Sequence, residues 1–129
     1  MELVERRRAA RYEIDLKGEL VTAKQDVIDA RIINLSFSGI QIKASTEFAH
    51  QLFPNLSREY PIDTVQFDLS IRLPKPFTPP HVRIGVVYLR RTSSLDMILG
   101  CRFEKFYDSS AEELASYLAV LKDISDLQS

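Results

Sequence analysis

The residues best able to do chemistry lie in two short stretches of the N-terminal third of the chain. The first, residues 5–11, contains four arginines, and Arg7 and Arg11 have the spacing R-x-x-x-R. The second, residues 34–39, reads N-L-S-F-S-G and has the spacing N-x-S-x-x-G. A guanidinium group presents five N–H donors in a planar fork that matches phosphate oxygens or the O6/N7 edge of guanine. The arginines therefore predict an anionic ligand, and a purine nucleotide with phosphates fits their chemistry.

Neither stretch is specific when it is taken alone. A run of charges near a chain end is usually a solvated tail, and Asn, Ser and Gly are preferred in any tight connection between strands. Their conjunction is more informative, because both stretches lie at the edges of the same predicted sheet. A helical turn would put Arg7 and Arg11 on one side, whereas an extended arm would separate them by about 13 Å. The sequence leaves both geometries open.

The elements that must position these residues are short strands. Alternation of apolar and polar residues predicts six of them, over residues 12–20, 28–32, 40–42, 65–73, 82–88 and 97–103. The N-x-S-x-x-G stretch falls in the connection between the second and the third. Six short strands with no helix between most of them indicate an antiparallel barrel or sandwich.

Four other features interrupt or end this pattern. Gly18, inside the first strand, is typical of a bulge or a sharp bend. A short helix is expected over residues 46–53, and four prolines between residues 74 and 80 predict a stiff, polyproline-like connection. The C-terminal segment has apolar residues at three- and four-residue steps, which predicts an amphipathic helix that starts near Ser109 or Ser110. This helix must cover an open end of the barrel or a second copy of the protein.

Composition limits the classes of function. The chain has 129 residues, 45% of them hydrophobic, and a formal net charge of −1, which argues against a general nucleic-acid coat. No apolar run approaches the length of a membrane span or of a signal peptide. Cys101 is the only cysteine, so no internal disulfide is possible and a reducing cytoplasm is the predicted compartment. Its place in a strand predicts that it is a small residue of the core. His50 and His81 are isolated, and nothing indicates a metal site, a cofactor or an enzyme.

An R-x-x-x-R motif followed by N-x-S-x-x-G, ahead of a run of strands, resembles the PilZ domain, a bacterial receptor module for cyclic di-GMP. The resemblance implies a mainly β fold: a six- to seven-stranded antiparallel barrel with one C-terminal amphipathic helix. It implies a single domain with three parts: a flexible arginine-rich arm (residues 1–11), the barrel (residues 12–105) and the C-terminal helix (residues 106–129). The ligand-binding residues that it implies are Arg6, Arg7, Arg11, Asn34, Ser36 and Gly39.

The sequence departs from the common family pattern at one of these positions. Asn34 stands where many members carry Asp, and an amide donates hydrogen bonds as well as accepting them, so an altered affinity is expected. The late Gly100-Cys101-Arg102-Phe103 resembles the G-x-x-F of the family's last strands, which is interpreted as structural. The resemblance covers roughly residues 5–105.

The leading hypothesis is a cyclic di-GMP receptor that orders its N-terminal arm on binding and signals to an unidentified downstream protein. The alternative is a nucleotide-free PilZ-fold protein-interaction module. A small barrel that binds RNA or single-stranded DNA is disfavoured by the neutral net charge and the aromatic content of 9%. No membrane insertion is expected. The number of nucleotides bound, one or two, and a homodimer through the C-terminal helix are left open.

Overall fold

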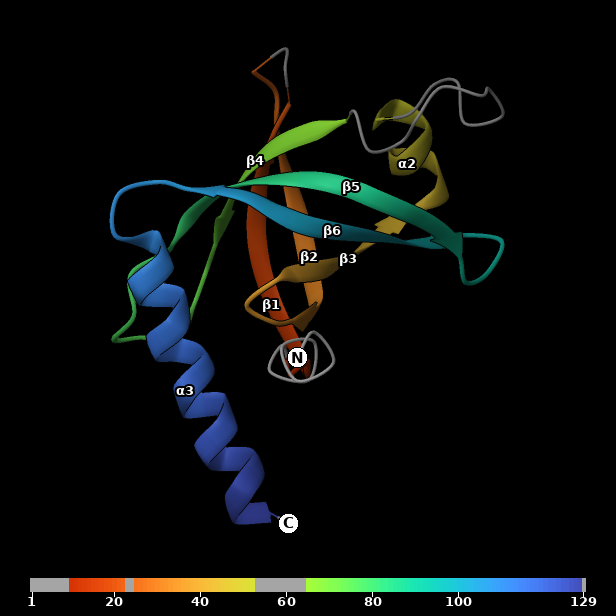
Figure 1. Ribbon diagram of the computed structural model, residues 1–129. Coiled ribbons are helices and arrows are strands. Elements are labelled where there is room, and N and C mark those ends of the chain that lie inside the picture. Colours follow the sequence, from red (N-terminus) through yellow and green to blue (C-terminus); the bar gives the residue numbers. More distant parts are fainter. Residues whose placement is uncertain (1–9, 23–24, 53–64, 129) are drawn as a thin grey trace, which may run out of the picture.

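Six strands form a closed antiparallel barrel in the computed structural model, in the order β1-β2-β3-β6-β5-β4 (Figure 1). The structure describes residues 10–22, 25–52 and 65–128. The elements are β1 (Tyr12–Val21), β2 (Val27–Leu35), β3 (Gly39–Ser45), α2 (Thr46–Leu52), β4 (Gln66–Ile71), β5 (His81–Arg91), β6 (Asp96–Phe106) and α3 (Ser110–Gln128). The predicted fold class, a mainly β antiparallel barrel with one C-terminal helix, is confirmed.

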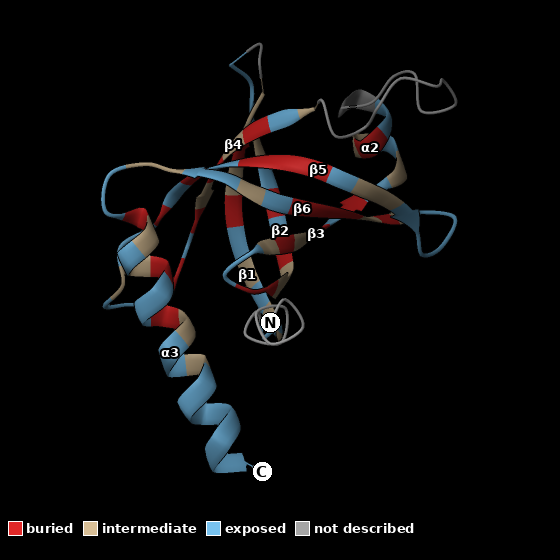
Figure 2. Ribbon diagram, viewed as in Figure 1, coloured by how far each residue is buried: buried red, intermediate tan, exposed pale blue. Residues whose placement is uncertain are grey.

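Buried residues recur along the strands of the barrel (Figure 2), and the core that they form consists of apolar residues of the alternating pattern. The side chains that are at most 1% exposed come from every strand; they include Leu20, Ile32, Ile42, Leu69, Ile84 and Leu99. Burial of this apolar surface is the main driving force for folding. The outward-facing residues between them are mostly charged or polar, which is why the period of two is so clear in the sequence.

Gly18 serves the barrel in a different way from the one predicted. The ladder between β1 and β2 is irregular between Glu13 and Leu16, whereas Gly18 pairs regularly with Ala30 on one side and with Ile71 on the other. A Cβ atom on Gly18 would lie 2.7 Å from the carbonyl oxygen of Ser70. The glycine therefore permits the close approach of β1 and β4 that closes the barrel, and the bulge lies nearer the start of the strand.

The connection between β4 and β5 also differs from its prediction. β4 ends at Ile71, because the Leu73 N–H donates to the Ile71 carbonyl in a tight turn that leaves the ladder. The proline-rich segment is not simply extended, since the Phe77 N–H donates to the Pro74 carbonyl at 3.1 Å. The Phe77 ring then packs edge-on against Tyr117 of α3, with ring centroids 5.4 Å apart. The connection thus forms part of the surface on which α3 rests.

The two halves of α3 have different surroundings. Its first turns are anchored by hydrogen bonds of 2.7 Å from the His81 N–H to Ser110 Oγ and from the Thr78 N–H to Glu113 Oε1. Leu114 is fully buried and joins the barrel core. The distal half extends away from the barrel (Figure 1), and Ile124 and Leu127 are 47% and 87% exposed. No helix among the described residues is long and apolar enough to cross a membrane.

Candidate ligand-binding surface

The register of β1 and β2 brings the end of the arginine motif to the N-x-S-x-x-G connection. Tyr12 pairs with Leu35, and Glu13 pairs with Asn34. Arg11, the residue before β1, is therefore next in line beside Ser36, the first residue of the connection. The Arg11 side chain is exposed. Arg6 and Arg7 lie outside the described residues.

Ser36 is the hydrogen-bonding centre of the β2–β3 turn. Its Oγ atom accepts from the N–H groups of Ser38 and Gly39 at 3.2 and 3.1 Å, and its own N–H donates to the Gly39 carbonyl at 2.9 Å. The residue is only 1% exposed. Asn and Ser favour turns because their side chains hydrogen-bond to nearby backbone groups, and Gly favours them because it has no side chain to restrict the backbone. The Ser36 hydroxyl is thus used inside the turn.

Gly39 sets how closely this turn approaches β6. It pairs with Arg102, and a Cβ atom on it would collide with the backbone carbonyl oxygen of Cys101. The Phe103 N–H also donates to the Ser38 carbonyl at 3.1 Å, which fastens the turn to the same strand. Because the obstructing atom belongs to the backbone, no side-chain movement could make room for a larger residue. Gly39 is therefore required by the packing of the hairpin.

Asn34 differs from Ser36 and Gly39 because its side chain remains available. The ladder between β2 and β3 shifts between Ile32 and Asn34, so Ile33 is an extra residue on β2, and Asn34 pairs with Gln41. The flanking pair Leu35 and Ile40 is buried in the barrel, so Asn34 and Gln41 face outward. Within the described part of the chain, the half-buried Asn34 amide makes no hydrogen bond.

A polar contact that the sequence did not predict lies beside Asn34. The Gln41 side-chain Nε2 donates to the Tyr88 hydroxyl at 2.5 Å, although the two residues are 47 positions apart. Tyr88 pairs with Gly100, and a Cβ atom on Gly100 would overlap the Tyr88 ring. The glycine of the G-x-x-F resemblance therefore leaves space for an aromatic ring on the outer face, which supports its structural interpretation. Alternation in the sequence placed Tyr88 on the same side of the fifth strand as Val86, but the β5–β6 ladder shifts between these two residues and Tyr88 faces outward.

Three phenylalanines lie next to the turn. The Phe37 ring stacks on Phe106, with ring centroids 5.7 Å apart and ring planes at 16° to each other. The ring centroids of Phe106 and Phe103 are 5.2 Å apart. Phe103 and Phe106 pack against the core, whereas Phe37 is 48% exposed. This cluster covers the barrel beside the turn and supports the position of residues 36–38.

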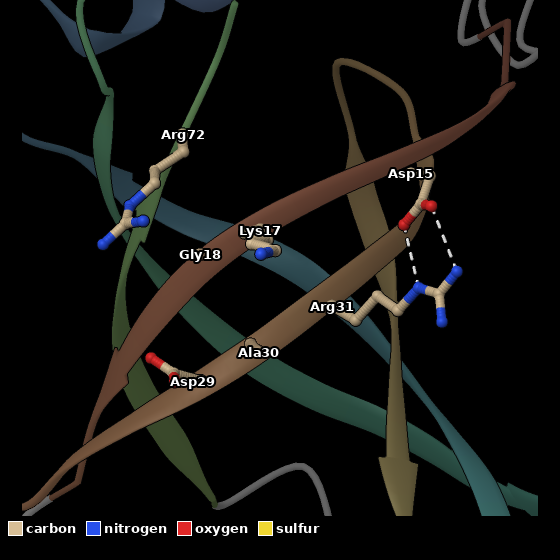
Figure 3. A pocket seen from close by; sticks show the side chains of 7 residues that line it. All are labelled: Asp15, Lys17, Gly18, Asp29, Ala30, Arg31 and Arg72. Carbon is tan, nitrogen blue, oxygen red and sulfur yellow. Dashed lines mark hydrogen bonds and ion pairs between the residues drawn. The ribbon is translucent and has the colours of Figure 1, made fainter.

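A hollow of about 440 Å³ lies further along the outer face of β1 and β2 (Figure 3). Its two arginines have carboxylate partners: Arg31 forms two hydrogen bonds with Asp15, at 2.8 and 3.0 Å, and Arg72 forms an ion pair with Glu19 at 3.3 Å. Lys17 is the third basic residue of the lining. The hydrogen bond from Arg31 lowers the pKa of Asp15 below its ordinary value. Because its arginines already have carboxylate partners, the hollow is a poor candidate for an anion site.

The described residues give no evidence of a metal or nucleophile site. No group of three or more His, Cys, Asp or Glu side chains among them is placed to hold a metal ion. Cys101 is buried as predicted, and its burial raises the pKa of the thiol to about 12. A buried thiol with a raised pKa is unreactive at neutral pH.

Comparisons with known proteins agree with this geometry. A family model of the PilZ domain matches residues 5–120. No curated protein matches the chain. Among solved structures, the Bacillus subtilis inhibitor of motility (MotI/DgrA) superposes with a TM-score of 0.66 at 15% identity, covering 93% of this chain and 52% of that one. The PilZ domain of YcgR from Escherichia coli with c-di-GMP gives 0.66 at 14%, covering 95% and 96%.

A third structure, the Borreliella burgdorferi PlzA protein in complex with c-di-GMP, gives a TM-score of 0.60 at 11% identity, covering 98% of this chain and 55% of that one. At these identities the structures show a common fold. This chain spans about half the length of the MotI/DgrA and PlzA chains and nearly all of the YcgR domain. Because the family model matches most of its residues, the chain belongs to the PilZ domain family.

Proposed function

We propose that this chain is a receptor for cyclic di-GMP. The observation that supports the proposal is the β1–β2 register, in which Arg11 directly precedes the pairs Tyr12–Leu35 and Glu13–Asn34, so that the arginine motif ends at the turn. Two of its structural relatives, the YcgR domain and PlzA, were solved with c-di-GMP. The ligand carries two phosphates and two guanines, and these are the groups that arginine and an amide side chain recognise.

The site residues divide into two roles in this proposal. Arg6, Arg7 and Arg11 bind the phosphates and the O6/N7 edges of the guanines, and Asn34 contacts a guanine from the barrel. Ser36 and Gly39 hold the turn and the backbone against which the ligand lies. Asn34 in place of the common Asp adds a hydrogen-bond donor for guanine O6 and removes a negative charge from the vicinity of the phosphates.

Signalling would follow from ordering of the arm of residues 1–11 over the ligand. The entropy lost by the arm must be exceeded by charge-assisted hydrogen bonds, so the response depends on the arginines. A downstream protein then recognises the closed form. The exposed apolar residues of the distal half of α3 are the surface we assign to a homodimer. A bacterial cytoplasm, which keeps the single thiol reduced, is the proposed location.

Calorimetric titration with cyclic di-GMP tests the proposal, with GTP and cyclic di-AMP as controls. We expect saturable binding of cyclic di-GMP only, with a stoichiometry that decides between one nucleotide and two. Arg7→Ala and Arg11→Ala should each lower the affinity about 10- to 100-fold, because each removes charge-assisted hydrogen bonds to the ligand. The matched control is Arg91→Ala, since Arg91 lies at the β5–β6 end of the barrel, away from the turn.

The alternative function, a PilZ-fold interaction module without a nucleotide, has one observation in its favour. Ser36 and Gly39 are needed by the hairpin itself, so their presence does not require a ligand. Absence of binding heat with the wild-type protein would support this alternative. Equal affinities in the wild type and both arginine variants would instead show that cyclic di-GMP binds elsewhere.

A further inference from the structure

A row of outward-facing residues crosses the barrel from the end of the arginine motif. Consecutive cross-strand partners form this row on β1, β2, β3, β6 and β5; they are Glu13, Asn34, Gln41, Gly100 and Tyr88. Directly opposed residues on an antiparallel pair have Cβ atoms about 5 Å apart. The Asn34 and Gln41 amides are therefore close enough to contact one small ring system.

The Gln41 amide is oriented by a fixed neighbour. Its Nε2 donates to the Tyr88 hydroxyl, and the Tyr88 ring lies directly over Gly100, where any side chain on residue 100 would displace it. Both Gln41 and Tyr88 are half-buried, which limits their rotation. With one N–H group engaged by Tyr88, the Oε1 atom of Gln41 makes no hydrogen bond within the described residues and is left as an acceptor.

We propose that Gln41 contacts a guanine base of bound cyclic di-GMP through this oxygen, next to Asn34, and that Tyr88 is the residue that positions it. The inference rests on the proposed function and adds two residues that the family motifs do not contain. Guanine presents adjacent N1–H and N2–H donors beside its O6 acceptor. Asn34 donates to O6 and Gln41 Oε1 accepts from the donors, so the two amides read one base edge together.

The same arrangement disfavours adenine. Adenine has an amino donor in place of O6 and an acceptor at N1, so the Gln41 oxygen would face a lone pair. Matching adenine would require the Gln41 amide to turn over and the Tyr88 hydroxyl to change from acceptor to donor. A polar group of the site that is left unpaired by the wrong base lowers the affinity for that base.

The experiment compares cyclic di-GMP and cyclic di-AMP binding to the wild type, Gln41→Met, Gln41→Ala, Tyr88→Phe and the double variant Gln41→Met/Tyr88→Phe. Met keeps the length of the side chain and removes the amide, and Ala provides a second variant in case Met perturbs the packing. Gln66→Ala is the matched control, because Gln66 is an exposed glutamine of β4 that also makes a side-chain hydrogen bond, to Glu104. Thermal melting of each variant establishes that the barrel is folded.

We expect Gln41→Met and Gln41→Ala to lower the affinity for cyclic di-GMP about tenfold, the effect of losing one well-placed hydrogen bond. Their preference for cyclic di-GMP over cyclic di-AMP should narrow, and Gln66→Ala should match the wild type. Tyr88→Phe should lower the affinity about threefold, and the double variant should equal Gln41→Met, because Tyr88 acts through Gln41.

Wild-type affinity and preference in both folded Gln41 variants would overturn this inference and leave the receptor function intact. Additive losses in the double variant would overturn the positioning role of Tyr88. Absence of cyclic di-GMP binding by the wild type would overturn the receptor function and, with it, this inference. The failure of each proposal is therefore recognisable.

Discussion

The β2–β3 hairpin contains two groups of residues that differ in whether their hydrogen-bonding groups are used inside the fold. Ser36 and Gly39 are engaged with the backbone of the turn and of β6, and Ser36 is almost completely buried. Asn34 and Gln41, a few residues away, face outward with amide groups that still have hydrogen-bonding capacity. A single six-residue motif, N-x-S-x-x-G, thus contributes one residue to a surface and two to its support. Such a motif indicates how the hairpin is built before it indicates what the hairpin binds.

Because Ser36 and Gly39 support the turn, we expect substitutions there to lower the stability of the fold. Substitutions of the outward-facing Asn34 and Gln41 should instead alter ligand binding. The largest effect is expected from Gly39→Ala, because the added Cβ would collide with the backbone carbonyl of Cys101. The free energy of unfolding, measured by urea denaturation, should fall by about 3 kcal/mol, as for other substitutions that force backbone to move. The thiol of Cys101, whose pKa burial raises to about 12, should also react faster with a thiol reagent at pH 8.

Gly85→Ala is the control for this substitution. A Cβ atom on Gly85 would meet only the flexible end of the Glu104 side chain, which can move aside. Its stability should therefore stay within about 0.5 kcal/mol of the wild type. Equal stabilities for the two alanine variants would show that the turn has room to move and that Gly39 does not hold it in place.

Ser36→Ala should have an intermediate effect. It removes the acceptor of two backbone N–H groups, those of Ser38 and Gly39, in a residue that is nearly inaccessible to water. Unfolding free energy should fall by about 1–2 kcal/mol in thermal or urea denaturation, with cyclic di-GMP affinity within about threefold of the wild type. The control is Ser94→Ala, because Ser94 is an exposed serine of the β5–β6 turn. A large loss of affinity at unchanged stability would place the Ser36 hydroxyl in the binding surface and break the division between the two groups.

The sequence was sufficient for the features that depend on local pattern. Alternation along single strands predicted the six strands, and the three- and four-residue steps predicted α3, because each reports which side of one element is buried. It was insufficient for features that depend on which strands become neighbours. The bulge at Ile33, the close approaches at Gly18 and Gly39, and the Gln41–Tyr88 hydrogen bond all depend on how the strands pair and align with one another. Arg6 and Arg7 lie outside the described residues, so their part of the site remains a prediction.

Asn34→Asp gives the smallest expected effect on stability, and it tests the pairing of Asn34 with Glu13 within the outward row. Asn34 lies directly opposite Glu13 of β1, so an aspartate at that position would put two acidic side chains on residues whose Cβ atoms are about 5 Å apart. Like charges in directly opposed positions destabilise a sheet, and the free energy of unfolding at pH 7 should fall by about 0.5 kcal/mol. Glu13→Gln in the same chain should restore it, because the repulsion needs both charges.

The salt dependence of this difference follows from the same cause. Repulsion between two exposed carboxylates is screened by salt, and the screening length falls to about 3 Å at 1 M ionic strength. Urea denaturation curves of the wild type and Asn34→Asp should therefore differ at low salt and coincide at about 1 M sodium chloride. A difference that persists at high salt would mean that the introduced aspartate is unfavourable for its shape or hydrogen bonding and not for its charge. Loss of the difference would instead explain why an amide suits this barrel: Glu13 already places a carboxylate across from that position, and a second one would act against both the sheet and an anionic ligand.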